Sequence, residues 1–181
     1  MQRVREQVQV PEQLYDGQSN TSPAVIAVLD TGIAYHPDLA GKLLCFADFV
    51  EKRQFPYDDN GHGTHICGIL CGSGELSEGR FRGMAPGAKL VVGKVLDNNG
   101  EGSCDAMRNA LQWVLRLKNR YKIRILNISV GIGDLKERYK EQVLREELEK
   151  LWDHNILVVC AAGNNGPVDG SISEMASSRK V

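Results

Sequence analysis

Four short runs of apolar residues, rich in Val, Ile and Leu, constrain the fold of this chain more than any other feature. The runs are Ala24–Leu29, Lys89–Leu96, Ile123–Val130 and Ile156–Ala162, and each is bordered by Gly, Pro, Asn or Asp. An apolar run that does not alternate with polar residues is typical of a strand buried on both faces, as in a parallel sheet. The sequence therefore predicts four interior strands of one parallel sheet.

Two segments between these runs have the periodicity of amphipathic helices. In residues 104–118 apolar side chains recur every three or four positions, and Leu135–His154 is a longer, more charged segment with a second apolar stripe. Strands that alternate with such helices predict an α/β fold: a three-layer, doubly wound, mostly parallel sheet with helices on both faces. No linker or repeat interrupts residues 23–181, so we expect one domain there, after an N-terminal arm over residues 1–22.

The charged residues are balanced, because 22 Lys and Arg face 23 Asp and Glu and the formal net charge is −1. No large block of one sign is present, so neither a nucleic acid nor an anionic membrane surface is an expected partner. The apolar runs are far shorter than the roughly 20 residues that cross a bilayer. These features exclude the nucleic-acid-binding and membrane-spanning classes of protein.

The five cysteines form an odd set without the dense spacing of a secreted disulfide scaffold. Cys67 and Cys71 are four residues apart, so we expect them to pack as small hydrophobic side chains on one helix face. The polar N-terminus, Met1–Pro11, contains no stretch typical of a signal peptide. We therefore expect a cytoplasmic protein, or a secreted one if a leader precedes this sequence.

Three polar motifs lie next to the predicted elements, and ligands of open α/β sheets bind beyond the carboxyl ends of the strands. The first motif is Asp30-Thr31-Gly32, directly after the first predicted strand. Asp30 is either a turn-capping aspartate or a catalytic carboxylate. The same triplet marks aspartic proteases, but these need a second copy or a dimer and an all-β fold, and the helical segments argue against that fold.

The second motif is Asp59-Asn60-Gly61-His62-Gly63-Thr64-His65, which continues into an apolar helical pattern. The glycines on both sides of His62 leave its ring room to face a cleft. Alternatively, His62 and His65 are ordinary helix-start residues, or two metal ligands with Cys67 or Cys71 as a third. The spacing does not match the known zinc motifs, so we assign no metal ligand.

The third motif is Ala161-Ala162-Gly163-Asn164-Asn165-Gly166-Pro167, directly after the fourth predicted strand. Small residues let a substrate approach the backbone closely, and the Asn164 amide can donate to an oxygen that becomes negative. Taken alone, the motif is more typical of a plain Asn-Gly turn than of a catalytic donor.

Together, and in this chain order, the three motifs resemble those of the subtilisin-like serine proteases, the subtilases. Four further segments are similar to that family: His36-Pro37-Asp38-Leu39, Gly83-Met84-Ala85-Pro86, Lys94-Val95-Leu96 and Asn127-Ile128-Ser129-Val130-Gly131. The resemblance runs from about Ser22 to Val181 and looks closest to the intracellular bacterial type.

This resemblance implies acyl transfer by an Asp-His-Ser triad. Asp30 would orient His62, His62 would act first as general base and then as general acid, and Asn164 would donate to the oxyanion. By the same resemblance, an extended polypeptide substrate would be flanked by Gly100, Glu101, Gly102, Ser129, Val130 and Gly131. Ala161, Ala162 and Gly163 would line the pocket for the residue before the scissile bond.

The nucleophile of the family lies in a Gly-Thr-Ser motif, and no serine of this sequence follows Gly-Thr. We therefore expect a subtilase domain that is incomplete at its C-terminus and inactive as written. The alternative is a non-catalytic peptide- or partner-binding protein on the same fold. No cofactor is expected for catalysis. Asp38 matches one calcium-ligand position of the family, but no structural calcium site is assigned, and the sequence does not predict an oligomeric state.

Overall fold

The computed structural model describes residues 2–9, 22–129, 138–164, 166, 167, 169 and 171–180. A five-stranded sheet forms the centre of this part of the chain, in the order β2-β3-β1-β4-β5. Its strands are β1 (Val25–Asp30), β2 (Leu43–Asp48), β3 (Lys89–Lys94), β4 (Ile123–Ile128) and β5 (Leu157–Cys160), and all neighbours pair in parallel. The predicted parallel sheet is therefore confirmed, with β1 at its centre. The prediction of four interior strands is wrong for β5, which lies at one edge of the described sheet with alternate side chains exposed.

Strand β2 is absent from the sequence-based prediction. Its residues, Leu43–Asp48, form one edge of the sheet and are mostly only half-buried. The apolar segment here is short, and it lacks the length and β-branching that identify β1 and β3 as interior strands. An edge strand is paired on one side only, so it needs a weaker apolar pattern than an interior strand.

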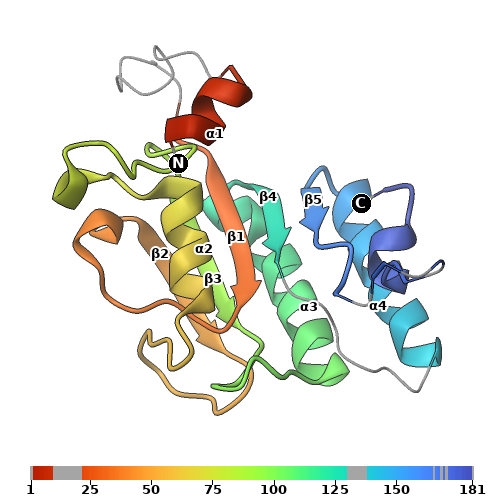
Figure 1. Cartoon of the computed structure of the whole chain (residues 1–181). Helices are drawn as coiled ribbons and strands as arrows, with labels where there is room; N and C mark the ends of the chain where they lie inside the picture. Colours follow the sequence, from red (N-terminus) through yellow and green to blue (C-terminus); the bar gives the residue numbers. More distant parts are fainter. Residues whose placement is uncertain are drawn as a thin grey trace.

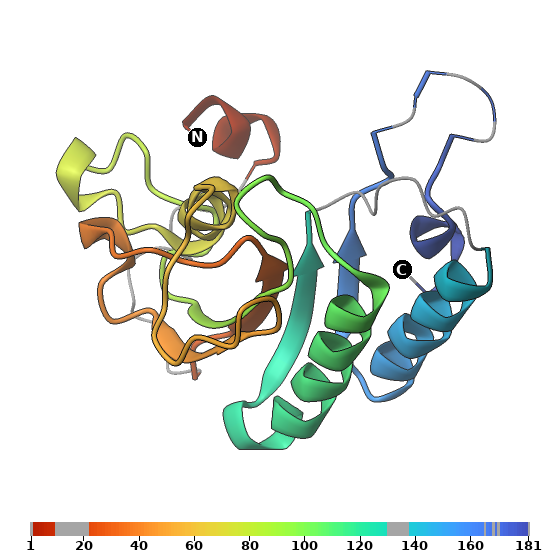
Figure 2. The same ribbon diagram turned by 90° about the horizontal axis from the view of Figure 1, so that it is seen from below.

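Helices cover both faces of the sheet, as the alternation of patterns predicts. Helix α2 (His62–Cys71) lies against one face, and α3 (Cys104–Tyr121) and α4 (Arg138–Asp153) lie against the other (Figures 1 and 2). The side of α3 and α4 holds the larger apolar core, which includes Leu111, Leu126 and Leu148. The side of α2 holds a smaller one, which contains Cys67 and Cys71. The fold is thus a three-layer α/β fold, and the all-β fold of an aspartic protease is excluded.

The remaining helical elements are short. They are α1 (Gln2–Gln7) and the 3₁₀ turns η2 (Pro37–Leu39), η3 (Glu75–Ser77) and η4 (Glu174–Ser177). Helix α1 belongs to the predicted N-terminal arm, and the Arg5 guanidinium donates to the carbonyl oxygen of Arg82 at 2.8 Å. Among the described helices, none combines the length and apolar character that a membrane span requires.

The topology of the sheet fixes where a site can form. The chain runs from β1 through β2 to β3 on one side of β1 and then crosses to β4 on the other. Such a reversal of direction opens a crevice beyond the carboxyl ends of the two strands that flank it. Asp30 ends β1 and Ser129 follows β4, so both lie at this crevice, and Ala161 follows β5 at the same edge.

Candidate active site

Asp30 and His62 form a hydrogen-bonded pair at the carboxyl edge of the sheet. The Asp30 Oδ1 atom lies 2.7 Å from His62 Nδ1. The Asp30 side chain is fully buried, whereas 44% of the His62 side chain is exposed. The carboxylate accepts a hydrogen bond from the Nδ1–H group, which leaves Nε2 as the acceptor nitrogen of the imidazole. The predicted proximity of Asp30 and His62 is therefore confirmed.

Burial disfavours the charged form of Asp30, whereas hydrogen bonds favour it. Burial raises the pKa of the Asp30 carboxyl, and the hydrogen bonds from His62 and from the Thr31 backbone N–H offset only part of that effect. Both donors use Oδ1. Among the described residues, no donor reaches the buried Oδ2 atom. The stability of the charged pair thus depends on how firmly His62 is held at Oδ1.

Two glycines bring the first turn of α2 against the end of β1. A Cβ atom on Gly63 would lie 2.3 Å from the Gly32 carbonyl oxygen and 3.2 Å from Asp30 Cβ. Gly32 itself has a φ of +124°, and a Cβ there would lie 2.1 Å from the carbonyl oxygen of Tyr57. Only residues without side chains permit these approaches. These glycines therefore allow the first turn of α2, with His62, to lie close to Asp30.

A second carboxylate, Asp58, joins the same two segments. It accepts hydrogen bonds from the hydroxyl groups of Thr31, at 2.8 Å, and Thr64. The backbone N–H groups of Gly61 and Thr64 donate to it as well, each at 2.8 Å. The loop before α2 is thus tied both to the end of β1 and to the helix that it begins.

A buried lysine makes another link between this loop and β1. The Lys94 side chain is 1% exposed, and its Nζ atom donates to the Thr31 carbonyl oxygen and to Asp59 Oδ1, each at 2.7 Å. The ammonium group also lies 5.0 Å from the centre of the Tyr57 ring, within the range of a cation–π contact. A buried charge that is paired and hydrogen-bonded in this way holds the neighbouring backbone in place.

The third predicted motif follows β5 and is more open. The Ala161 N–H donates to the Ile128 carbonyl oxygen at 2.9 Å, and the Ala162 carbonyl accepts from the Ser173 N–H at 2.8 Å. Ala161 and Gly163 are half-buried, and Ala162 and Asn164 are exposed. Asn164 therefore stands on the same edge of the sheet as Asp30, with its amide accessible.

The residues expected to flank a substrate lie on two loops. Gly100 is half-buried, and Glu101 and Gly102 are exposed. The Asp97 N–H donates to the Glu101 carbonyl at 2.8 Å and closes the turn that contains Gly100. Ser129 is half-buried and accepts a hydrogen bond from the Asn127 side chain at 2.8 Å. Val130 and Gly131 lie outside the described residues.

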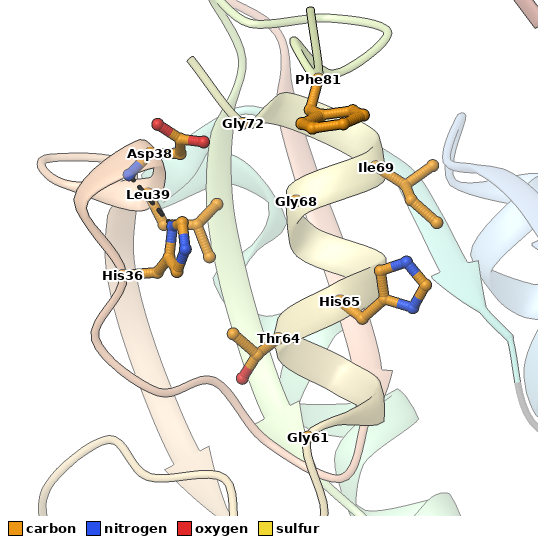
Figure 3. Close-up of a pocket in the computed structure, with 10 residues that line it drawn as sticks. All are labelled: His36, Asp38, Leu39, Gly61, Thr64, His65, Gly68, Ile69, Gly72 and Phe81. Carbon is orange, nitrogen blue, oxygen red and sulfur yellow. Dashed lines mark hydrogen bonds between the residues drawn. The ribbon is translucent and has the colours of Figure 1, made fainter. Parts of the chain in front are cut away.

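The second histidine of the motif faces elsewhere. His65 is exposed on the outer side of α2 and lines a pocket of about 600 Å³ (Figure 3). Cys67 and Cys71 lie on the buried side of the helix, and burial raises the pKa of the Cys71 thiol to about 11, so it stays protonated at neutral pH. In the part of the chain that the structure describes, no group of three or more His, Cys, Asp or Glu side chains is placed to hold a metal ion. His65 and the two cysteines therefore lie on different sides of α2.

The supporting network of Thr31, Asp58, Thr64 and Lys94 is not part of the sequence-based site. Asp58 carries a signal that could have indicated it, because an Asp at the start of a turn such as Asp-Asp-Asn-Gly accepts the N–H groups two and three residues later. Lys94 carries none, since a lysine at the end of an apolar run is more often exposed than buried. Its role depends on a contact between segments far apart in the sequence.

Comparison with known proteins agrees with this geometry. Residues 21–181 match the family described as "Subtilase family". The chain is 39% identical over 175 residues to serine protease AprX of Bacillus subtilis, with 94% of this chain and 40% of that protein covered. It is 35% identical over 148 residues to thermitase of Thermoactinomyces vulgaris, with 80% and 49% covered.

Solved structures give the same result. Sphericase superposes with a TM-score of 0.69 at 28% identity, covering 90% of this chain and 54% of that one. The S41 psychrophilic protease superposes with a TM-score of 0.69 at 30% identity, covering 89% and 54%. The chain thus spans about half the length of the relatives that it matches. With the family's motifs, fold and extent of match in agreement, this chain belongs to the subtilase family of serine proteases.

Proposed function

We propose that this chain supplies the acid–base half of a serine endopeptidase, with His62 as general base and Asp30 as its orienting carboxylate. The hydrogen bond of 2.7 Å between Asp30 Oδ1 and His62 Nδ1 carries the proposal. It holds the Nδ1 proton in place, so that Nε2 is available to take a proton from a nucleophile. After that transfer, the carboxylate stabilises the imidazolium and His62 returns the proton to the leaving amine.

Asn164 is the proposed donor to the oxyanion. Its exposed position after β5 places a side-chain amide at the carboxyl edge of the sheet. A donor aimed at the oxygen that becomes negative stabilises the transition state more than the ground state. The amide N–H group donates this hydrogen bond. Because asparagine is uncharged, no charge has to be desolvated.

The nucleophile is proposed to lie in a Gly-Thr-Ser segment encoded beyond Val181. No serine of this chain follows Gly-Thr, and the chain spans only 40% and 49% of AprX and thermitase. Support also comes from β5, where Leu157 and Val159 are each 49% exposed while Val158, on the side of α4, is buried. Side chains alternate along a strand, so Leu157 and Val159 form an uncovered apolar face that a further helix would bury. Without the serine, the chain should not hydrolyse peptides.

Substrates are proposed to be polypeptides bound in an extended conformation. The exposed loop that carries Gly100, Glu101 and Gly102 lies after β3, and Ser129 follows β4, so a peptide between them could pair with backbone on both sides. The small side chains of Ala161 and Ala162, with Gly163, leave space beside β5 for the residue before the scissile bond. No cofactor is proposed for this chemistry.

A calcium site at Asp38 is not supported by its contacts. Asp38 Oδ1 accepts a hydrogen bond from the Leu76 N–H at 3.1 Å and from the Ser73 hydroxyl at 3.3 Å. Protein donors thus occupy Oδ1 of Asp38, and hard cations such as Ca²⁺ require six to eight oxygen ligands. We propose that the loop around Asp38 is held by hydrogen bonds.

We further propose that residues 23–181 are the N-terminal part of one catalytic domain, without its Gly-Thr-Ser segment, and that the protein is cytoplasmic. An intracellular relative supports that location: the major intracellular serine protease of Bacillus subtilis is 34% identical over 161 residues. Thiol titration of the denatured, non-reduced protein tests it, with about five thiols expected. A reproducible count of three or one would reveal disulfides and contradict a reducing compartment.

The experiment that tests the proposed function uses the protein expressed from its whole reading frame. We expect a fluorophosphonate probe to label one serine, peptide mapping to place it in a Gly-Thr-Ser segment, and the labelled protein to lose peptidase activity. If a well-folded protein binds peptides but is not labelled by the probe and does not cleave peptides, the protease proposal is wrong. The protein would then be a peptide-binding protein on the same fold.

A further inference from the structure

The Asp58 carboxylate lies between the two segments that carry Asp30 and His62. On one side it contacts Thr31, the residue after Asp30, and on the other it contacts Thr64, two residues after His62. The strand-like pairing of Gly32 with Asp58 keeps the loop in this position, and the Ile33 N–H donates to the Tyr57 carbonyl at 3.1 Å. Asp58 makes no hydrogen bond to Asp30 or His62. Its negative charge adds to the rise in the pKa of Asp30, whereas its effect on the geometry of the pair passes through its neighbours.

Two threonine hydroxyls link Asp58 to both segments, because each donates one hydrogen bond and accepts another. The Thr31 Oγ1 atom donates to Asp58 Oδ1 and accepts from the Gly63 N–H at 2.9 Å. The Thr64 Oγ1 atom donates to Asp58 Oδ2 and accepts from the Ala34 N–H at 2.9 Å. Each hydroxyl thus joins the segment after β1 to the first turn of α2, and Asp58 fixes the direction in which both hydroxyls donate.

The same carboxylate shapes the turn that leads into His62. Its Oδ1 atom accepts from the Asn60 N–H at 3.2 Å and from the Gly61 N–H at 2.8 Å. The Asn60 side chain then accepts from the His62 N–H at 3.1 Å. The backbone on both sides of His62 is therefore hydrogen-bonded to a group that Asp58 holds.

These contacts require the ionised form of Asp58. Burial acts to raise the pKa of this carboxyl, but the hydrogen bonds from Thr64, Gly61 and Thr31 outweigh it and lower the pKa below its ordinary value of 3.8. An ionised carboxylate offers acceptor sites only, which matches a surrounding made of donors. A neutral amide of the same shape would turn an N–H₂ group toward some of these donors.

We propose that Asp58 is a positioning residue for the Asp30–His62 pair, a role that rests on the proposed function of that pair. Through Thr31 and Gly63 it sets the distance between the end of β1 and the start of α2, and through Asn60 and Gly61 it sets the direction in which His62 leaves the loop. Its loss should loosen the Asp30–His62 hydrogen bond while the sheet persists.

The test compares Asp58→Asn with a matched control, Asp48→Asn, in the protein expressed from its whole reading frame. Asp48 also accepts several hydrogen bonds, from the backbone N–H groups of Val50, Glu51 and Arg53 and from the Tyr57 hydroxyl, but none from the segment after β1 or from α2. The readout is the downfield NMR signal of the His62 Nδ1 proton, assigned by its absence in His62→Gln. Exchange of this proton with water reports the hydrogen bond directly, whether or not the protein is active.

We expect Asp58→Asn to speed this exchange at least tenfold or to abolish the signal, and Asp48→Asn to leave it within about twofold at a comparable loss of stability to urea. Equal effects of the two variants would overturn the proposal, because they would show general loosening of the fold. An unchanged signal in folded Asp58→Asn would overturn it as well.

A second pair of variants serves if Asp58→Asn does not fold. Thr31→Val keeps the shape of the side chain and removes its hydroxyl, whereas Thr31→Ser restores the hydroxyl. We expect the first to speed exchange of the His62 proton and the second to rescue it. Equal exchange rates in the two variants would refute the positioning role. A protein without peptidase activity in which both results still hold would refute the proposed function but leave the positioning role intact.

Discussion

The two sides of the candidate site are built in different ways. On the side of β1 and α2, Asp30 is fully buried and hydrogen bonds from Asp58 and Lys94 tie together the segments around it. On the side of β5, Asn164 is exposed and its loop is anchored near the strand by single backbone bonds at Ala161 and Ala162. Both a general base and an oxyanion donor act best when their geometry is set before the substrate arrives. The difference indicates that the described contacts hold the Asp30–His62 pair more firmly than Asn164.

The largest expected effect is the loss of the base. His62→Ala should reduce kcat of the protein from the whole reading frame by about 10⁶-fold, the size known for loss of the histidine in subtilisin. His65→Ala is the matched control, since His65 is three residues away on the same helix and faces a different pocket. Peptide hydrolysis under saturating substrate measures both, and a larger loss in His65→Ala would reassign the base.

The open side should show a smaller loss of activity and almost no loss of stability. Asn164→Ala is expected to reduce kcat by about 10²–10³-fold, as for removal of this donor in subtilisin. Because the Asn164 side chain is exposed, the free energy of unfolding should change by less than about 0.5 kcal/mol. Kinetics and urea unfolding of the same preparation give both numbers. A change in KM alone would show that Asn164 binds substrate without acting on the transition state.

On the side of β1 and α2, the difference should appear in the pH dependence of the free energy of unfolding. The folded pKa of Asp58 lies below its unfolded value of 3.8, so its contribution is present above that value and is lost as the pH falls through the folded pKa. Asp58→Asn should therefore destabilise the protein at neutral pH by about 1–3 kcal/mol and flatten the loss of stability in acid. Urea unfolding from pH 7 to pH 3 measures this dependence. Asn164→Ala should leave its slope unchanged.

The smallest effect is expected at the apolar face of β5. Replacing Leu157 and Val159 by Thr in this 181-residue chain should change its stability by no more than about 0.5 kcal/mol per site, since each side chain is half exposed. The same change should raise solubility, which light scattering of concentrated samples measures. A large loss of stability would mean that this face is already covered within the chain.

Sequence patterns predict most of this architecture because interior strands and amphipathic helices leave periodic signals. The patterns at residues 104–118 and 135–154 correspond to α3 and α4, although α3 continues to Tyr121 and residues 135–137 lie outside the described part. The edge strand β2 leaves a weak signal because it is only half-buried. Asp30 and His62 follow from motifs, whereas the link from Lys94 to Asp59 joins residues 35 positions apart and leaves no local pattern.

The contact between Gly63 and Gly32 has a consequence for the genetics of this protein. Any missense change in the codon of Gly63 adds a Cβ atom, and that atom would meet the Gly32 carbonyl oxygen at 2.3 Å whatever the new residue is. Repacking of neighbouring side chains cannot relieve a clash with backbone. In a saturation library selected for activity, position 63 should therefore tolerate glycine alone. Position 65, two codons further on, should accept most amino acids.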